Sequence, residues 1–268
     1  MAFDYIQPVD ADFLEFIQSL NVQTLGRKVV FHTETDFPNI ENAAIAIIGV
    51  HENRGFEGHN EHTDLTAIRK EFYSLFPGNW DQIVDLGNVV AGSSSEDTYY
   101  VLRTAVAHLI KNGVIPIVIG GSQDLTYAIY RAYDQLEQMV NVVAIDSKFD
   151  FEKDEEQLAA HSFLTKMIVE EPNNLFNYSN VGYQTYFNSQ EEIDLIEKLY
   201  FDAYRLGEIC NNSTIAEPVF RDADLVSLDL TSVKSSDSGN FTQFIPNGFN
   251  GKEICVLSRY AGISDKVT

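Results

Sequence analysis

The sequence has 268 residues, of which 44% are hydrophobic and 12% aromatic, enough apolar material for a large buried core. Its formal net charge is -22, because 40 acidic residues stand against 18 lysines and arginines. Such a surface repels nucleic-acid phosphates and anionic membranes, so we expect neither as a partner. The charge itself is typical of a solvated surface.

Cys210 and Cys255 are too few for a disulfide framework, and neither has a Cys or His close by at metal-ligand spacing. The N-terminus lacks the basic-then-apolar order of a signal peptide, and no apolar run reaches transmembrane length. We therefore expect reduced thiols and a cytoplasmic protein. No linker or composition break divides the chain, which favours one domain over residues 1–268.

Hydrophobic periodicity predicts alternating helices and strands along the chain. Helices are expected, in order, at 10–20, 63–76, 96–112, 125–138, 163–169, 191–206 and 251–260. Strands are expected at 29–32, 43–50, 83–89, 115–119, 140–145, 180–183 and 223–230. This alternation indicates a three-layer α/β fold, with a mostly parallel central sheet and helices on both faces.

Polar residues follow three of the buried strands. A glycine turn, residues 120–124, ends the first of them; Asp146, with Lys148 and Asp150 close behind, ends the second, and Asp229 ends the third. Because the carboxyl ends of parallel strands meet at one edge of a sheet, we expect the three aspartates to converge there. Neighbouring carboxylates repel one another, so the cluster needs a divalent cation or the Lys148 ammonium as a compensating charge.

These strand ends resemble the motifs of the ureohydrolase family, which includes arginase, agmatinase and formimidoylglutamase. Four segments carry the resemblance, and three of them are similar to the family's G-G-D-H-S, D-A-H-x-D and S-x-D-x-D-x-x-D-P motifs. In chain order, the segments are 46–55 (the family's first strand and loop), 117–121, 143–150 and 227–230. The motifs fall in the family's order. Residues 174–186 and 247–267 are most similar to formimidoylglutamase-like members.

The resemblance implies an arginase-like fold and a two-manganese site whose bridging hydroxide attacks a guanidino or formimino carbon. Three ligand positions of the family are replaced here. Gln123 stands in place of the first motif's histidine, Lys148 in place of the second motif's histidine, and Thr231 in place of the third motif's second aspartate. Half of the expected ligands are therefore degenerate.

One cation would keep Asp146, Asp150 and Asp229, with the amide oxygen of Gln123 as a fourth ligand. That oxygen set suits no more than one weakly bound divalent cation, Mn²⁺, Mg²⁺ or Ca²⁺. The second cation would face the Lys148 ammonium, so we expect no second cation there. Lys148 is instead expected within hydrogen-bonding reach of Asp146 and Asp229. The cofactor expected is therefore either none or the one weakly bound divalent cation.

Two functions remain open. The first is a ureohydrolase-fold protein with a degenerate dinuclear centre, inactive as an arginase and serving a binding, regulatory or scaffold role. The alternative is a metal-dependent hydrolase of a guanidino or formimino C–N bond, of the formimidoylglutamase, agmatinase or arginase kind. The resemblance also allows a homo-oligomer and a small amidine or amino-acid ligand, and it does not identify any protein partner.

Other histidines have weaker signals. His161 lies roughly where the family has a substrate-contacting loop, although an ordinary loop histidine is the favoured interpretation. His51, His59 and His62 match no zinc-ligand spacing, which favours a solvated loop. Relative to the family, the chain stops at Thr268, before a further strand and helix. It is either a shortened copy or part of a longer product.

Overall fold

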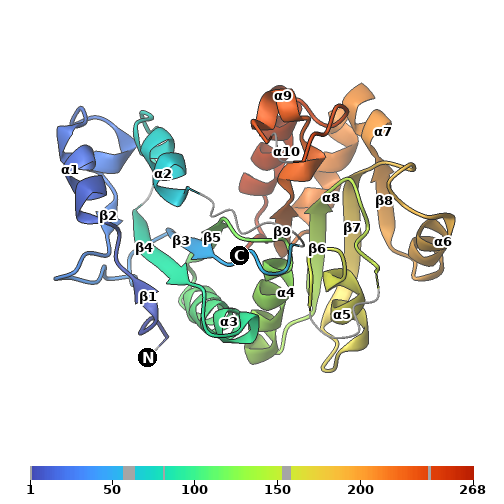
Figure 1. Cartoon of the computed structure of the whole chain (residues 1–268), viewed down its shortest axis with the longest axis horizontal. Helices are drawn as coiled ribbons and strands as arrows, with labels where there is room; N and C mark the ends of the chain where they lie inside the picture. Colours follow the sequence, from blue (N-terminus) through green and yellow to red (C-terminus); the bar gives the residue numbers. More distant parts are fainter. Residues whose placement is uncertain (1, 57–63, 81, 153–157, 241–242) are drawn as a thin grey trace. The chain divides into compact units, whose positions relative to one another are not determined.

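The computed structural model describes residues 2–56, 64–80, 82–152, 158–240 and 243–268. The chain divides into two compact units, Met1–Leu136 together with Thr268, and Glu137–Val267. Each unit contains one sheet with helices beside it (Figure 1). The expected single domain over residues 1–268 stays a prediction.

The first sheet is built around two parallel strands, β3 (Ile45–His51) and β4 (Ile83–Val90). On its other side β3 pairs in parallel with β5 (Ile115–Ile119). β4 also pairs with two short strands, β1 (Ile6–Gln7), which is antiparallel, and β2 (Val30–Phe31), which is parallel. The inner residues of β3 are all buried, the pattern of a strand covered on both faces.

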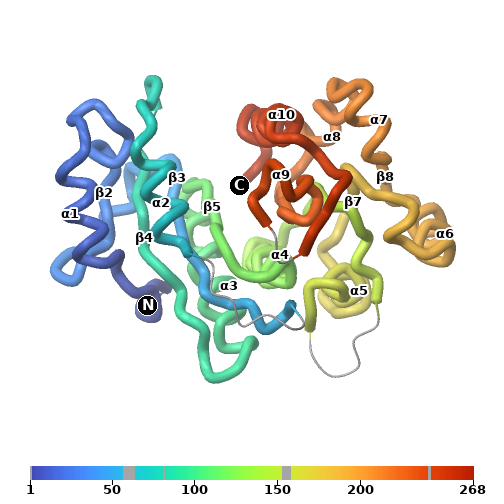
Figure 2. The backbone as a smooth tube through the Cα atoms, turned by 45° about the horizontal axis from the view of Figure 1, so that its top comes forward, coloured from blue at the N-terminus to red at the C-terminus, as the bar shows by residue number. Residues whose placement is uncertain are grey.

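Helices lie on both sides of this sheet. Phe13, Ile47 and Tyr73 belong to one buried cluster, which packs α1 and α2 against β3. Figures 1 and 2 show α3 on the opposite side, next to α4. The helices are, in order, α1 (Ala11–Ser19), the 3-10 helix η1 (Leu25–Arg27), α2 (Leu65–Tyr73), α3 (Ser95–Lys111), α4 (Leu125–Tyr130) and the 3-10 helix η2 (Arg131–Leu136).

A buried ion pair joins α2 to β4. The Arg69 guanidinium donates through Nε to Asp85 Oδ2 at 2.8 Å and through Nη2 to Asp85 Oδ1 at 2.9 Å. Tyr73 donates to Asp85 Oδ2 at 2.6 Å, and the Gly87 N–H donates to Oδ1 at 2.9 Å. Arg69 also donates to Asn88 Oδ1 and to the Gly87 carbonyl. Asp85 thus accepts four hydrogen bonds and Arg69 donates four, which compensates the burial of both charges.

The second sheet contains parallel strands in the order β8-β7-β6-β9. Their bounds are β6 (Val140–Ile145), β7 (Leu175–Tyr183), β8 (Asp202–Arg205) and β9 (Leu225–Leu228). β6 lies between β7 and β9, so residues that follow β6 and β9 come to the same edge of this sheet.

The helices of the second unit are, in order, α5 (Phe163–Val169), α6 (Gln190–Lys198), α7 (Leu206–Asn211), η3 (Ser213–Ala216), α8 (Glu217–Arg221), η4 (Leu230–Ser232), α9 (Ser235–Ser238) and α10 (Gly251–Gly262). Four of them, α7, η3, α8 and α10, pack on the sheet through a cluster that includes Ile145, Phe220 and Leu257. The predicted α/β class, with mostly parallel strands and flanking helices, is confirmed. The strands form two sheets, one in each unit.

The predicted helix at 191–206 is wrong in its second half. α6 ends at Lys198, Tyr200 adopts a left-handed φ of 57°, and Asp202–Arg205 then pairs with β7 as β8. The predicted helix at 125–138 is α-helical only to Tyr130 and continues as the 3-10 helix η2. Both differences arise where tertiary contacts override the periodicity of a short segment.

β5 and β9 are the end strands of their sheets, each with one neighbouring strand among the described residues. β5 consists of four isoleucine and valine residues and a proline, and Ile115 and Ile117 remain 38% and 40% exposed. In the described part of the chain, no helix has the length and apolar character needed to cross a membrane.

Candidate functional site

The three aspartates expected at one edge lie together in the second unit. Asp146 directly follows β6 and Asp229 directly follows β9, two neighbouring strands in which Ile145 lies opposite Leu228. Asp150 lies in the loop behind Asp146. Burial raises the pKa of Asp150 well above its ordinary value, and the charges of Asp146 and Asp229 raise it further. The structure thus brings the three carboxylates close enough to repel one another.

Two of these carboxylates are held by hydrogen bonds from their own loops. The Lys148 N–H donates to Asp146 Oδ1 at 2.9 Å. Thr231 donates twice to Asp229, from its N–H to Oδ1 and from its hydroxyl to Oδ2, both at 2.8 Å. Thr231 is thus an orienting donor at the position where the resemblance implies a carboxylate ligand.

Asp150 is the less satisfied member. Its Oδ2 is buried and has no hydrogen-bond partner. The Tyr178 hydroxyl and Asn180 Oδ1, both on the neighbouring strand β7, are likewise buried without a partner. Burial raises the pKa of Tyr178, and the charges of Asp146 and Asp150 raise it further, so this hydroxyl is near the aspartates and keeps its proton. A proton or a cation at Asp150 would relieve the cluster.

Lys148 does not make the contact expected of it. Its side chain is exposed, and among the ion pairs of the described residues none joins its ammonium to Asp146, Asp150 or Asp229. The charge of Lys148 acts to lower the pKa of Asp150 and of Asp229, but burial raises both pKa values by more. The expected hydrogen-bonded ammonium is therefore wrong, because the long lysine side chain reaches water instead.

Gln123, the expected amide ligand, belongs to the first unit, whereas the three aspartates belong to the second. It is half-buried in the turn between β5 and α4. Its backbone carbonyl, not its side-chain amide, accepts a hydrogen bond from the Thr126 N–H. A set of four oxygen ligands that includes Gln123 stays a prediction.

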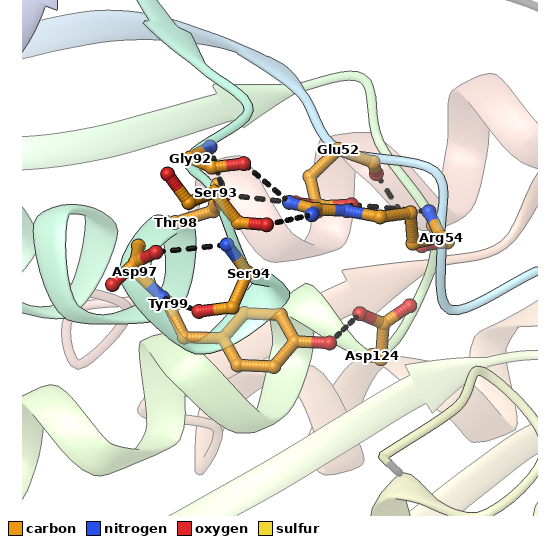
Figure 3. Close-up of polar contacts among 10 residues, drawn as sticks. Glu52, Arg54, Gly92, Ser93, Ser94, Asp97, Thr98, Tyr99 and Asp124 are labelled. Carbon is orange, nitrogen blue, oxygen red and sulfur yellow. Dashed lines mark hydrogen bonds and ion pairs between the residues drawn. The ribbon is translucent and has the colours of Figure 1, made fainter.

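A polar network in the first unit was not predicted from the sequence (Figure 3). Glu52, fully buried behind β3, accepts hydrogen bonds from Arg54 Nε and from the Thr98 hydroxyl, both at 2.8 Å. Arg54 also donates to the carbonyls of Gly92 and Ser93, each at 3.1 Å. Burial opposes the charge on Glu52, but these donors hold its pKa below the ordinary value. The network ties the loop after β3 to the loop before α3.

Asp124, directly after Gln123, is also fully buried. The Tyr99 hydroxyl donates to its Oδ2 at 2.5 Å, while its Oδ1 has no hydrogen-bond partner. Burial raises the pKa of Asp124. The carboxyl group packs on Gly55, where an added Cβ would lie 2.0 Å from Oδ1. The sequence signals Asp124 only as an acid after a glycine turn, and this signal does not identify Tyr99 or Gly55 as its neighbours.

We expect Gly55→Ala to destabilise the protein, because the new methyl group would collide with the buried Asp124 carboxyl. Overpacking of this kind typically costs about 1–3 kcal/mol. Urea unfolding followed by circular dichroism measures the change. Gly207→Ala in α7 is the matched control, because nothing lies within 4 Å of its Cβ position. Equal stability of the two variants would contradict the collision.

The histidines do not complete a metal site among the described residues. His161 Nε2 lies 3.9 Å from Glu152 Oε2, and its backbone carbonyl accepts from the Glu152 N–H, as an ordinary loop histidine does. His51 ends β3, whereas His59 and His62 lie outside the described residues. Across the described residues, no three His, Cys, Asp or Glu side chains are grouped so that they could hold a metal ion.

The donor set decides which metal centre these residues fit. A manganese pair does not fit, because the segments after β6 and β9, residues 146–150 and 229–231, contain no histidine and Thr231 uses its hydroxyl to bind Asp229. One hard cation fits the chemistry better, since the available donors are oxygens and Asp150 Oδ2 is buried without a partner.

Comparisons with known proteins give one consistent result. The model of the arginase family matches residues 59–230. A formimidoylglutamase from Staphylococcus carnosus is 26% identical over 199 residues, which cover 72% of this chain and 62% of that protein. One from Staphylococcus aureus is 30% identical over 168 residues, 61% of this chain and 52% of that protein. The chain thus spans between half and two thirds of these relatives.

Solved structures agree on the fold. A Trypanosoma cruzi formiminoglutamase with Mn²⁺ superimposes with a TM-score of 0.75 at 20% identity, covering 87% of this chain and 88% of that one. A formimidoylglutamase from Bacillus subtilis gives 0.71 at 14% identity, with 88% and 83% covered. The family model matches more than half of the sequence, and the motif order and parallel strands agree with it. The chain belongs to the arginase family.

Proposed function

We propose that this chain is a formimidoylglutamase-like hydrolase, which cleaves the C–N bond of a small formimino or guanidino compound with the help of one divalent cation. The relatives named formimidoylglutamase support the reaction class. The carrying observation is Asp150, a buried carboxyl group beside two others, whose Oδ2 has no hydrogen-bond partner. A divalent cation that displaces the proton of this group would compensate its charge and those of its two neighbours.

The residues that would hold the cation are Asp146, Asp150 and Asp229. Two of them are oriented in advance, Asp146 by the Lys148 N–H and Asp229 by the two donors of Thr231. Preorganised carboxylates lose less conformational entropy when they bind a ligand. A divalent cation bound there would lower the pKa of a water molecule on it, so that hydroxide would form near neutral pH.

The charge of the site suits the substrate class. Formimino and guanidino groups are cationic when protonated, and the aspartate edge is acidic. The chain's net charge of -22 adds a field that draws divalent cations toward the protein. We expect the aspartates to bind the amidine end of the substrate as well as the metal ion.

A second candidate is a non-catalytic member that binds an amidine without cleaving it. The specific observation in its favour is that Gln123 and Lys148 stand where the resemblance implies histidine ligands, and Thr231 where it implies an aspartate. The comparisons favour the hydrolase, because the matched relatives carry an enzyme's name. Release of product distinguishes the two, because only the hydrolase would form it.

We expect at most one Mn²⁺ per chain after loading and gel filtration, measured by elemental analysis. Asp146→Asn should bind none, since it removes a charge but keeps the oxygen that accepts the Lys148 N–H. Asp222→Asn is the matched control, because Asp222 is exposed and pairs with Lys266 elsewhere in the second unit. Two tightly held ions per chain would contradict the single site.

The activity test uses formiminoglutamate, arginine and agmatine, with formamide and urea as the products measured. We expect formiminoglutamate to be cleaved only with the divalent cation present, and Asp146→Asn to lose that activity. A turnover of about 1–1,000 s⁻¹ would be that of an ordinary enzyme. A wild-type protein that binds the cation and all three compounds, yet releases neither product, would establish the non-catalytic candidate instead.

A further inference from the structure

The loop Ser147–Asp150, which carries Asp150 away from β6, is held by side chains rather than by a regular backbone ladder. The Phe149 N–H donates to Asn188 Oδ1 at 2.8 Å, and Asn188 Nδ2 donates to the Ser147 carbonyl at 3.0 Å. The Asn180 amide donates to the Lys148 carbonyl at 2.7 Å. Two asparagines from β7 and the segment after it thus bind three successive loop residues.

Asn188 is the member best placed to fix the loop. It is buried, and its Nδ2 also donates to the Gln184 carbonyl at 2.8 Å. The Gln184 N–H donates in turn to the Ser147 carbonyl at 3.0 Å. Each end of the amide is therefore used, and the loop is anchored to the turn after β7. A polar residue with this set of bonds has one orientation only.

The loop needs such an anchor because its conformation is unusual. Asp150 has a φ of 57°, a left-handed backbone that residues other than glycine adopt rarely. Such a conformation persists where the surroundings determine it. Phe149 is fully buried against the Tyr183 ring, with centroids 4.9 Å apart, and its N–H is the group that Asn188 binds. Packing and the amide together set the direction in which the Asp150 carboxyl group points.

We infer that Asn188 is a positioning residue of the aspartate site: it fixes the Ser147–Asp150 loop and thereby aims the Asp150 carboxylate. Asn188 acts through this loop and is not one of the three carboxylates that would hold the cation. The inference rests on the proposed function for its effect on cation binding, while its effect on the loop is independent of that function. Residues that orient metal ligands typically change metal affinity about 10–100-fold when replaced.

The test compares Asn188→Ala with Asn173→Ala. Asn173 is a matched control in the same unit, because its Oδ1 accepts from the Leu175 N–H and its Nδ2 donates to the Ile168 carbonyl, away from the aspartates. Mn²⁺ affinity is measured by calorimetry at a temperature where each variant is folded. We expect Asn188→Ala to bind about 10–100-fold more weakly and Asn173→Ala to bind like the wild type.

Two further measurements keep the inference open to refutation. Asn188→Asp preserves shape and the acceptor for the Phe149 N–H but removes both donors, so it should also weaken binding even where the alanine variant folds poorly. A crystal structure of Asn188→Ala without cation should show a displaced Asp150 carboxyl group and a changed φ. If the wild type binds no cation, the proposed function fails, and this loop comparison still decides the inference.

An unchanged Asp150 in that crystal structure overturns the inference. It is equally overturned if both Asn188 variants bind Mn²⁺ like the wild type and lose only melting temperature. In that case Asn188 supports folding in the way that Asn173 does.

Discussion

Arg69→Met is expected to lower the free energy of unfolding by about 3–5 kcal/mol, the range for breaking a buried ion pair by removing one partner. Asp85 is fully buried, and Arg69 supplies two of its hydrogen bonds. Methionine fills much of the space but leaves the carboxylate with only Tyr73 and the Gly87 N–H as donors. Urea unfolding of both proteins measures the loss.

The double variant Arg69→Met/Asp85→Leu should be more stable than the single variant, because it removes the uncompensated charge. Arg221→Ala serves as the surface control. Its exposed pair with Glu217, four residues earlier on α8, is the kind that contributes about 0.3–0.5 kcal/mol. A loss in Arg69→Met as small as that of the surface control would show that water reaches Asp85.

Asp150→Asn is expected to stabilise the protein at neutral and alkaline pH in the presence of EDTA. Burial first, and then the charges of Asp146 and Asp229, raise the pKa of Asp150 well above its ordinary value. In the unfolded chain the group ionises near pH 3.9. Between that pH and the higher folded pKa, the folded protein holds a proton that the unfolded chain has lost.

The sign of the pH dependence follows from this difference. Because the folded state binds more protons, the free energy of unfolding falls as the pH rises through that window. Each unit by which the pKa is raised removes about 1.4 kcal/mol by its upper end. Asparagine carries no ionisable proton, so the variant should lose most of this slope. Some slope remains, because burial also raises the pKa of Asp229.

Melting temperatures between pH 4.5 and 8.5 test this expectation, with Asp222→Asn as a control whose carboxylate is exposed. Mn²⁺ adds a second comparison. A cation that binds only the folded state raises its melting temperature, so the wild type should respond and Asp150→Asn should not. Parallel pH curves for all three proteins would mean that Asp150 ionises as freely in the fold as in water.

The sequence predicts the parts of this fold that depend on local pattern. The buried runs at β3 and β6 predict strands, because β-branched residues without charges suit a sheet covered on both faces. The approach of Asp146 to Asp229 is also predictable, since both follow neighbouring parallel strands. The position of Asp146 and Asp229 at one edge of the second sheet can therefore be predicted from the ends of β6 and β9 alone.

Contacts between distant segments are harder to predict. Asn188 lies 41 residues from Ser147, and nothing local marks it as the anchor of that loop. β8 has no apolar run and begins only a few residues after α6 ends at Lys198, so its pairing with β7 leaves no periodic signal. The direction of the Lys148 side chain depends on the free energy of hydrating its ammonium, which residue spacing does not encode.

The end strand β5 has a practical consequence for purified protein. An apolar strand with one paired edge is a template on which another chain can add a strand, and natural sheets protect such edges with charge, proline or short strands. β5 has Pro116 but no charged residue, and Ile115 and Ile117 are partly exposed. Solutions of this chain should therefore oligomerise as concentration rises, and a lysine at Ile117 should act as a gatekeeper that keeps the protein monodisperse in light scattering.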